Sequence, residues 1–315
     1  MVVDSPSGSP DLWRLEMAIP PPLEESLLWK LDSLGVQRLA VRHRPEAPEA
    51  RELVGWVDAE AWPAARRDAL AAALQPLGEP FGVAVPPLRW HPQAEEDWSH
   101  SWKQHWRPDP VGEKLLILPA WLEAPAEHQA RRALRLDPGS AFGTGSHPTT
   151  RLCLEALERQ AAERPNGLAG LRVADLGCGS GVLSLAALLL GADAVAAVDT
   201  DTLAVSATRA NAPLNGPELA GRLRVAHGSV EALAGLQGAP ADLLLCNILA
   251  PVIEALAPGF QEVLAPSGLG LLSGLLVEQA PRLEAVLAEE GWQARLEARQ
   301  EHWGLMSLRR LPTVA

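Results

Sequence analysis

The chain has 315 residues, of which 47% are hydrophobic, and 39 Asp and Glu outnumber 27 Lys and Arg. The net charge of −12 argues against a basic nucleic-acid surface, and three scattered cysteines are too few for a disulfide framework or a zinc site. The N-terminus lacks signal-peptide features and no apolar run is long enough to span a membrane, so we expect a cytoplasmic protein. Because the cysteines are few and scattered, we also expect no bound metal.

Residues 1–88 predict a small domain of their own. Two helices, one from Leu23 and one from about Trp62, alternate with four β-like runs: residues 12–19, 36–41, 53–57 and 81–85. The order β-α-β-β-α-β is typical of the ferredoxin-like α+β fold. No clustered His, Cys or paired carboxylates occur there, so we interpret the domain as a substrate-recognition module, with a structural appendage as the alternative.

Residues 89–110 are predicted to form a linker with a tryptophan-rich helix. Trp98, Trp102 and Trp106 recur every four residues and therefore share one face of a helix. We expect this stripe to pack against one or both domains rather than to bind a ligand.

Residues 111–315 predict the larger domain, and its first part contains an unusual loop. Two β-like runs, Leu115–Leu118 and Ala133–Leu136, indicate a hairpin that leads into DPGSAFGTGSHPTT, residues 137–150. A predicted helix follows the loop from about Thr149. Thr149 or Thr150 can cap that helix or face a ligand carboxylate, so a ligand site and a plain capped turn both remain open.

The next stretch predicts a strand, a tight turn and a helix, followed by a second strand. Its sequence is LRVADLGCGSGVLSLAALLLGADAVAAVDTD. The turn carries Gly177, Gly179 and Gly181, and the second strand ends in Asp199, whose carboxylate can bind a ribose diol. Dinucleotide sites require G-x-G-x-x-G, but Val182 stands where the third glycine would be. The spacing is instead typical of S-adenosylmethionine (SAM) sites; another nucleotide, including a nicotinamide cofactor, or a purely structural turn are the alternatives.

Strands and helices continue to alternate to the C-terminus. We predict helices at 202–211, 249–264 and 278–290, and strands at 223–226, 242–246, 268–272, 292–297 and 304–308. This pattern predicts a doubly wound, mostly parallel α/β sheet with an antiparallel finish. Asn247 directly follows the fourth strand, so it should lie at the same carboxyl edge as Gly177 and Asp199.

Taken together, the glycine turn, the 137–150 loop, CNILAP at 246–251 and DWSHSWKQHW at 97–106 resemble the ribosomal protein L-eleven methyltransferase family. The resemblance implies a Rossmann-like class I methyltransferase domain and a SAM-dependent enzyme that methylates lysine side chains and the N-terminal α-amine of ribosomal protein L-eleven. It implies SAM contacts at Thr149 or Thr150, Gly177, Asp199 and Asn247; Gly179 belongs to the same turn. It also implies that the N-terminal domain binds the protein substrate.

Methyl transfer to an amine requires the neutral amine, and an unperturbed lysine at pH 7 must first lose a proton at a cost of roughly 4 to 5 kcal/mol. We therefore expect Phe142 to form an apolar wall and Asn247 to accept a hydrogen bond that aligns the nitrogen lone pair. His147 could relay the released proton or could fix its loop by a hydrogen bond.

Two other functions remain open. Methyltransferases of nucleic acids or release factors also carry an Asn at this strand end, but they continue it with two prolines and an aromatic residue, whereas this chain has Ile248 and Leu249. A non-catalytic, SAM-binding, ribosome-associated module is the alternative from a different class.

Overall fold

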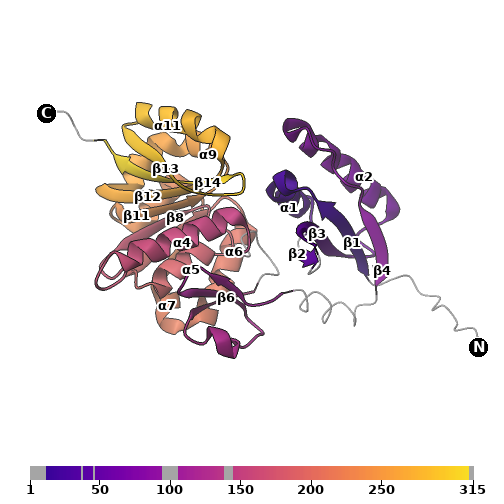
Figure 1. The fold of residues 1–315 in the computed structure, drawn as a ribbon, viewed down its shortest axis with the longest axis horizontal. Helices are drawn as coiled ribbons and strands as arrows, with labels where there is room; N and C mark the ends of the chain where they lie inside the picture. Colours follow the sequence, from indigo (N-terminus) through magenta and orange to yellow (C-terminus); the bar gives the residue numbers. More distant parts are fainter. Residues whose placement is uncertain (1–11, 37, 45–46, 94–105, 138–144, 312–315) are drawn as a thin grey trace, which may run out of the picture. The chain divides into compact units, whose positions relative to one another are not determined.

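The computed structural model describes residues 12–311 except 37, 45–46, 94–105 and 138–144 (Figure 1). The chain divides into two compact units, Met1–Arg107 and Pro108–Ala315. No described helix combines the length and the apolar composition needed to cross a membrane.

The N-terminal unit is a four-stranded antiparallel sheet in the order β2-β3-β1-β4. Its elements are β1 (Leu12–Ile19), η1 (Pro21–Leu23), α1 (Glu24–Ser33), β2 (Arg38–Arg44), β3 (Ala47–Asp58), α2 (Ala64–Leu74), η2 (Gln75–Phe81) and β4 (Arg89–Gln93). This strand order, with one helix after β1 and one after β3, is the predicted ferredoxin-like topology.

The two faces of the N-terminal sheet bury different residues. Leu15 and Met17 on β1 join the helices in one hydrophobic core, because alternate residues of a strand share a face. On the other face Arg42 donates from Nε to Glu52 Oε2 at 2.6 Å and from Nη2 to Glu16 Oε1 at 3.2 Å. Ion pairs thus satisfy the two buried carboxylates.

The predicted strand at 81–85 is wrong. Gly82 adopts a left-handed conformation with φ +61° at the end of η2, which interrupts the extended backbone, while Val85 packs into the core without pairing. β4 takes its place and pairs with β1.

Of the predicted tryptophan stripe, Trp106 packs against Ala40, Val54 and Trp56 on the outer face of the sheet. Trp98 and Trp102 lie outside the described residues.

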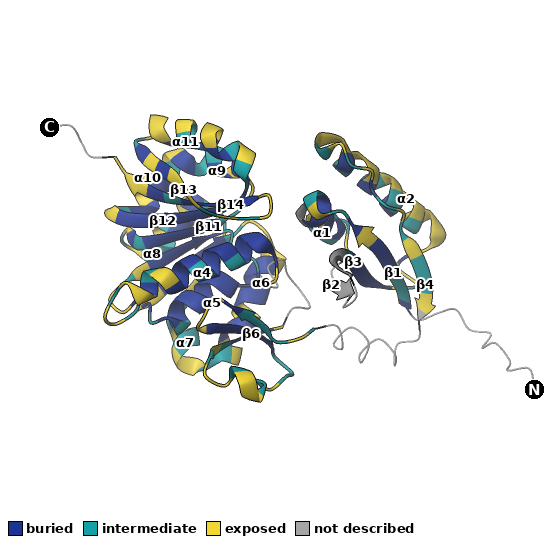
Figure 2. Cartoon of the chain, in the orientation of Figure 1, coloured by how far each residue is buried: buried dark blue, intermediate teal, exposed yellow. Residues whose placement is uncertain are grey.

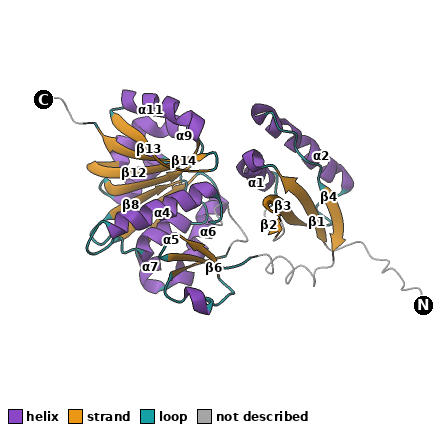
Figure 3. Cartoon of the chain, in the orientation of Figure 1, coloured by secondary structure: helices purple, strands orange, loops and turns teal. Residues whose placement is uncertain are grey.

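The C-terminal unit contains a seven-stranded sheet in the order β10-β9-β8-β11-β12-β14-β13. Figure 3 shows its strands in orange, with β8, β12, β13 and β14 labelled. Its strands are β8 (Arg172–Leu176), β9 (Ala194–Asp199), β10 (Leu223–His227), β11 (Ala241–Asn247), β12 (Leu264–Leu276), β13 (Trp292–Gln300) and β14 (Trp303–Arg310). The first five in this order are parallel, and β14 and β13 complete the sheet in antiparallel pairing. The predicted antiparallel finish is confirmed.

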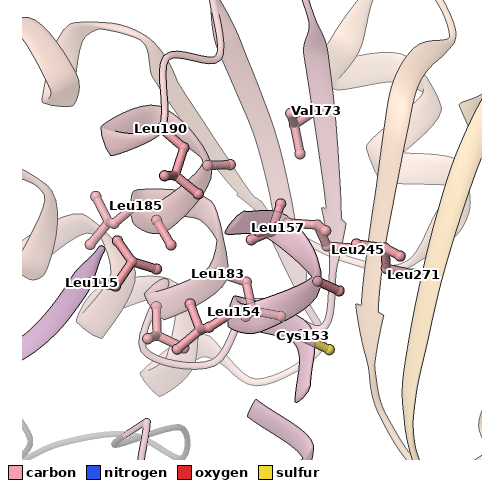
Figure 4. Packing of buried hydrophobic residues seen from close by; sticks show 14 of the residues in the cluster. Leu115, Cys153, Leu154, Leu157, Val173, Leu183, Leu185, Leu190, Leu245 and Leu271 are labelled. Atoms are coloured by element: carbon pink, nitrogen blue, oxygen red, sulfur yellow. The ribbon is translucent and has the colours of Figure 1, made fainter. Parts of the chain in front are cut away.

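Helices cover both faces of this sheet. They are α4 (Pro148–Ala162), α5 (Val182–Leu189), α6 (Thr202–Asn211), η5 (Ala212–Asn215), α7 (Pro217–Gly221), α8 (Val230–Gln237), α9 (Ala250–Leu256), η6 (Ala257–Gly259), α10 (Phe260–Val263), η7 (Val277–Gln279) and α11 (Ala280–Glu289). Leucines of α4 and α5 pack with Val173 and Leu245 on one face (Figure 4), whereas α8 to α11 pack on the other. The central strands β8, β9 and β11 are therefore buried on both sides (Figure 2), whereas the edge strands β10 and β13 are partly exposed.

The sequence predicted one long helix over 249–264, but the chain forms α9, η6 and α10 there. Pro258 has no N–H to continue the α9 hydrogen bonds, which explains the interruption. α8 was not predicted, although its Val230 and Leu233 are buried.

The predicted hairpin of 115–118 and 133–136 is also wrong. These runs form β6 (Leu115–Pro119) and β7 (Arg132–Leu136), which pair in parallel, and β5 (Asp109–Val111) pairs antiparallel with β6. The connection between β6 and β7 includes η4 (Ala126–His128) and has about the dozen residues that a parallel crossover needs. Hydrophobic alternation predicts a strand but not its direction.

A buried carboxylate fastens this small sheet to α4. Glu158 accepts backbone N–H groups from Glu113, Lys114 and Leu115 at 2.8, 2.9 and 2.7 Å. Gly112, with φ +53°, lies so close that a Cβ there would be 2.3 Å from Glu158 Oε2. The β5–β6 turn therefore depends on Glu158.

We expect Glu158→Ala to lower the free energy of unfolding of the C-terminal unit by about 3 kcal/mol, because buried N–H groups lose a charged acceptor. Urea-induced unfolding measures the change. The exposed Glu163→Ala, at the C-cap of the same helix, is the control and should change stability by less than about 0.5 kcal/mol. Equal effects of the two substitutions would contradict the anchoring role.

Candidate functional site

The glycine turn between β8 and α5 lies at the carboxyl edge of the sheet. Gly177, Gly179 and Gly181 have φ of +81°, +55° and +83°, a region that side chains disfavour. A Cβ at Gly177 would lie 2.4 Å from Ile248 Cγ2. The turn therefore presents bare backbone, and it does so directly beside the loop that follows β11.

Asp199, the last residue of β9, is joined to this turn. The Gly179 N–H donates to Asp199 Oδ2 at 2.9 Å, and the Asp201 N–H donates to Oδ1 at 2.9 Å. Burial raises the pKa of Asp199, while the backbone hydrogen bonds from Asp201 and Gly179 oppose the rise. Each carboxylate oxygen has two lone pairs, so both oxygens keep capacity for a ligand donor such as a ribose hydroxyl.

The N-terminus of α4 is capped by His147. Its Nδ1 accepts from the Thr149 N–H at 3.3 Å and lies 2.8 Å from Thr149 Oγ1. The imidazole and the Trp303 ring form a T-shaped pair with their centroids 5.1 Å apart. This is the loop-fixing hydrogen bond that the sequence offered as the alternative to a proton relay.

Asn247, the last residue of β11, reaches α4. Its Nδ2 donates to Thr150 Oγ1 at 3.3 Å across 97 positions of sequence. Its Oδ1 is buried and has no hydrogen-bond partner among the described residues. A buried acceptor without a partner is costly, so this atom is suited to a donor supplied by a ligand.

Asp175 lies beneath the turn and is fully buried. Ser184 Oγ donates to Asp175 Oδ2 at 2.5 Å, and Oδ1 has no partner within the described part of the chain. Burial raises the pKa of Asp175 to about 7, the Ser184 hydrogen bond opposes the rise, and the charge of Asp199 adds to it. Burial thus disfavours the charged form of the carboxyl beneath the turn.

The sequence did not single out Ser273 and Gly274 on the neighbouring strand. Ser273 pairs with Asn247, and the β12–β14 register shifts between Leu272 and Leu275. Gly274 has φ +83°, and a Cβ there would lie 2.3 Å from the Ile248 carbonyl oxygen. A β-bulge thus lets β12 approach the backbone that follows Asn247. In the sequence, only the isolated Gly274 in a strand pattern could have indicated this bulge.

The structure therefore brings most of the predicted site residues to one edge of the sheet. Gly179 contacts Asp199, Thr150 contacts Asn247, and Gly177 lies against Ile248. Phe142, the predicted apolar wall, lies outside the described residues.

Comparison with known proteins gives a consistent match over nearly the whole chain. The family model described as "Ribosomal protein L11 methyltransferase (PrmA)" matches residues 12–311. Two relatives named ribosomal protein L11 methyltransferase come from a Synechococcus species (60% identical, over 96% of this chain and 99% of the relative) and from Parasynechococcus marenigrum (61% identical, over 93% and 100%).

A solved structure described as a ribosomal protein L11 methylase from Lactobacillus delbrueckii subsp. bulgaricus is 33% identical. It matches with a TM-score of 0.57 over 66% of this chain and 100% of that chain. With the strand order of the large sheet, the match shows the predicted class I methyltransferase fold.

The raised pKa of Asp175 predicts a pH dependence of stability. The folded protein keeps the Asp175 proton between pH 3.8 and about 7, where the unfolded chain loses it. The stabilisation is therefore complete below pH 3.8 and is lost as pH rises to about 7.

The free energy of unfolding of the wild type minus that of Asp175→Asn should therefore fall by about 4 kcal/mol over this range and level off above it. Urea unfolding of both proteins at several pH values measures the difference. A difference that is independent of pH would be evidence against a buried, neutral Asp175.

We also expect Gly274→Ala to destabilise the protein more than Gly291→Ala. Both glycines have positive φ, +83° and +82°, but a Cβ at Gly291 meets nothing within 4 Å. The control should lose about 1 to 2 kcal/mol from its backbone conformation alone. Gly274→Ala should lose at least about 1 kcal/mol more, because the Ile248 backbone must move. Equal losses in thermal or urea unfolding would show that the close approach is unimportant.

Proposed function

This chain belongs to the ribosomal protein L11 methyltransferase family, and we propose that it methylates lysine side chains and the N-terminal α-amine of ribosomal protein L11. The protein is a SAM-dependent protein methyltransferase, and L11 is its substrate. The particular amines are the part proposed here. The structural observation that carries the proposal is the buried Oδ1 of Asn247 at the carboxyl edge of the sheet, which has no hydrogen-bond partner among the residues that the structure describes.

The residues of this edge fit SAM. The left-handed glycines at 177 and 179 leave bare backbone for the methionine and adenosine parts, and no phosphate has to be bound. Asp199 would accept hydrogen bonds from the ribose hydroxyls. Thr150, with Thr149 behind it at the N-terminus of α4, would face the carboxylate of the methionine part, where the positive end of the helix dipole favours negative charge.

Bound SAM supplies a methyl group already activated on a sulfonium. The protein then has to hold a neutral amine in line with that methyl group and exclude water. Asn247 Oδ1 would accept an N–H of the amine, and the bond from Nδ2 to Thr150 fixes which amide atom faces it. We propose Phe142 as the apolar wall that favours the uncharged amine.

The N-terminal unit is proposed to recognise the protein substrate, and a cytoplasmic location is proposed for the enzyme. The three cysteines are free, in keeping with a reducing compartment.

The nucleic-acid alternative lacks support in the residues after Asn247, where Ile248 and Leu249 provide no aromatic ring to stack on a base.

The proposal is tested by replacing Asn247 with Ala. We expect methyl transfer to L11 to fall by about 100-fold because the amine loses its aligning acceptor. The dissociation constant of SAM should rise by a much smaller factor. Radiolabelled methyl incorporation measures transfer, calorimetry measures SAM binding, and mass spectrometry of L11 identifies the modified amines.

The exposed Asn166→Ala in the same unit is the control and should transfer methyl groups at the wild-type rate. Near-normal transfer by Asn247→Ala would rule out the alignment role. A wild-type protein that binds SAM but modifies no L11 amine would instead be a non-catalytic binding module.

A further inference from the structure

A single buried amide connects the end of β7 to the glycine turn, which the proposed function places against SAM. Asn211 is the last residue of α6 and is 1% exposed. Its Oδ1 accepts from the Asp137 N–H at 2.8 Å, and its Nδ2 donates to the Ser180 carbonyl at 2.9 Å. Asp137 directly follows β7, and Ser180 lies inside the glycine turn.

The preceding turn of α6 holds the same glycine turn. Thr208 Oγ1 donates to the Gly179 carbonyl at 2.8 Å, and a Cβ at Gly181 would lie 2.9 Å from Thr208 Cγ2. Two successive carbonyls of the turn, at Gly179 and Ser180, are thus held by side chains of α6. The turn therefore keeps its position relative to this helix, and Asn211 extends the connection to Asp137.

The position requires an amide. Asn211 must accept one hydrogen bond and donate another at the same time, from two ends of one short side chain. Aspartate would keep the acceptor for Asp137 but would turn a second oxygen towards the Ser180 carbonyl. Alanine would leave both backbone groups without this partner.

Asn215, one turn further along, is a natural comparison. Its Oδ1 accepts from the Arg135 N–H at 2.8 Å, and its Nδ2 donates to the Arg135 carbonyl at 2.8 Å and to the Asn211 carbonyl at 3.0 Å. It therefore fastens the end of β7 to η5 with the same chemistry. These three hydrogen bonds do not reach the glycine turn.

We propose that Asn211 is a positioning residue that holds the glycine turn against the end of β7 and so keeps the turn in the conformation that binds SAM. The inference rests on the proposed function, because that function assigns the glycine turn to SAM. Loss of the coupling weakens SAM binding, since the turn is no longer preorganised. It leaves the methyl-transfer step itself nearly unchanged, since the hydrogen bond between Asn247 and Thr150 does not involve Asn211.

The test compares Asn211→Ala and Asn211→Asp with Asn215→Ala in the full chain. Calorimetric titration with SAM should show a dissociation constant raised about tenfold by each Asn211 substitution, roughly the effect of one lost buried hydrogen bond. Asn215→Ala should stay within about twofold of the wild type. In steady-state methylation of L11, the KM for SAM should rise in parallel, while kcat at saturating SAM stays within about threefold.

Wild-type affinity in Asn211→Asp would overturn the inference, because that variant keeps the acceptor for Asp137 and loses the bond to the turn. Equal weakening by Asn215→Ala would overturn it too, since the effect would then reflect general packing of this region. Should Asn211→Ala fail to fold, Asn211→Asp decides alone. A wild-type protein without SAM affinity would disprove the proposed function, whereas wild-type activity with unaffected Asn211 variants disproves only the coupling.

Discussion

The site depends on one long-range hydrogen bond, from Asn247 Nδ2 to Thr150 Oγ1. It joins the carboxyl end of β11 to the N-terminus of α4 and orients the amide so that its oxygen is left for a ligand. The neighbouring contacts keep both ends of this bond in place: His147 caps α4 on one side, and Gly274 lets the backbone after Asn247 approach β12 on the other. Each of these contacts is small, but all of them help to hold the side chains of Asn247 and Thr150 in place.

Beneath this edge the protein interior disfavours charge. Burial raises the pKa of Asp175 to about 7 and that of Cys153 to about 12, and it raises the pKa values of Cys178 and Cys246 as well. Asp199 is therefore the carboxylate at the rim that backbone N–H groups stabilise in its charged form. An interior that disfavours charge suits an amine that must be uncharged, and the oxygens of Asp199 at the rim can accept hydrogen bonds from the cofactor.

Patterns that are local in sequence predicted most of the fold. The glycine turn, the strand ending at Asp199 and the helix over 202–211 were found at their positions, because periodicity and positive-φ glycines are properties of neighbouring residues. The errors occurred where a local pattern has two outcomes. Val83 and Val85 alternate like a strand but pack without pairing, and β6 and β7 alternate like a hairpin but run parallel.

By itself the sequence determined the type of sheet, the order of most of its strands along the chain, and the strand ends that carry Gly177, Asp199 and Asn247. Only the tertiary structure decided which of these groups touch and which atoms remain for a ligand. The bulge at Gly274, the bond between Asn247 and Thr150 and the bridge made by Asn211 join residues far apart in the chain. The hydrophobic periodicity of the sequence does not predict these contacts, because they form only when the sheet brings the carboxyl ends of its strands together.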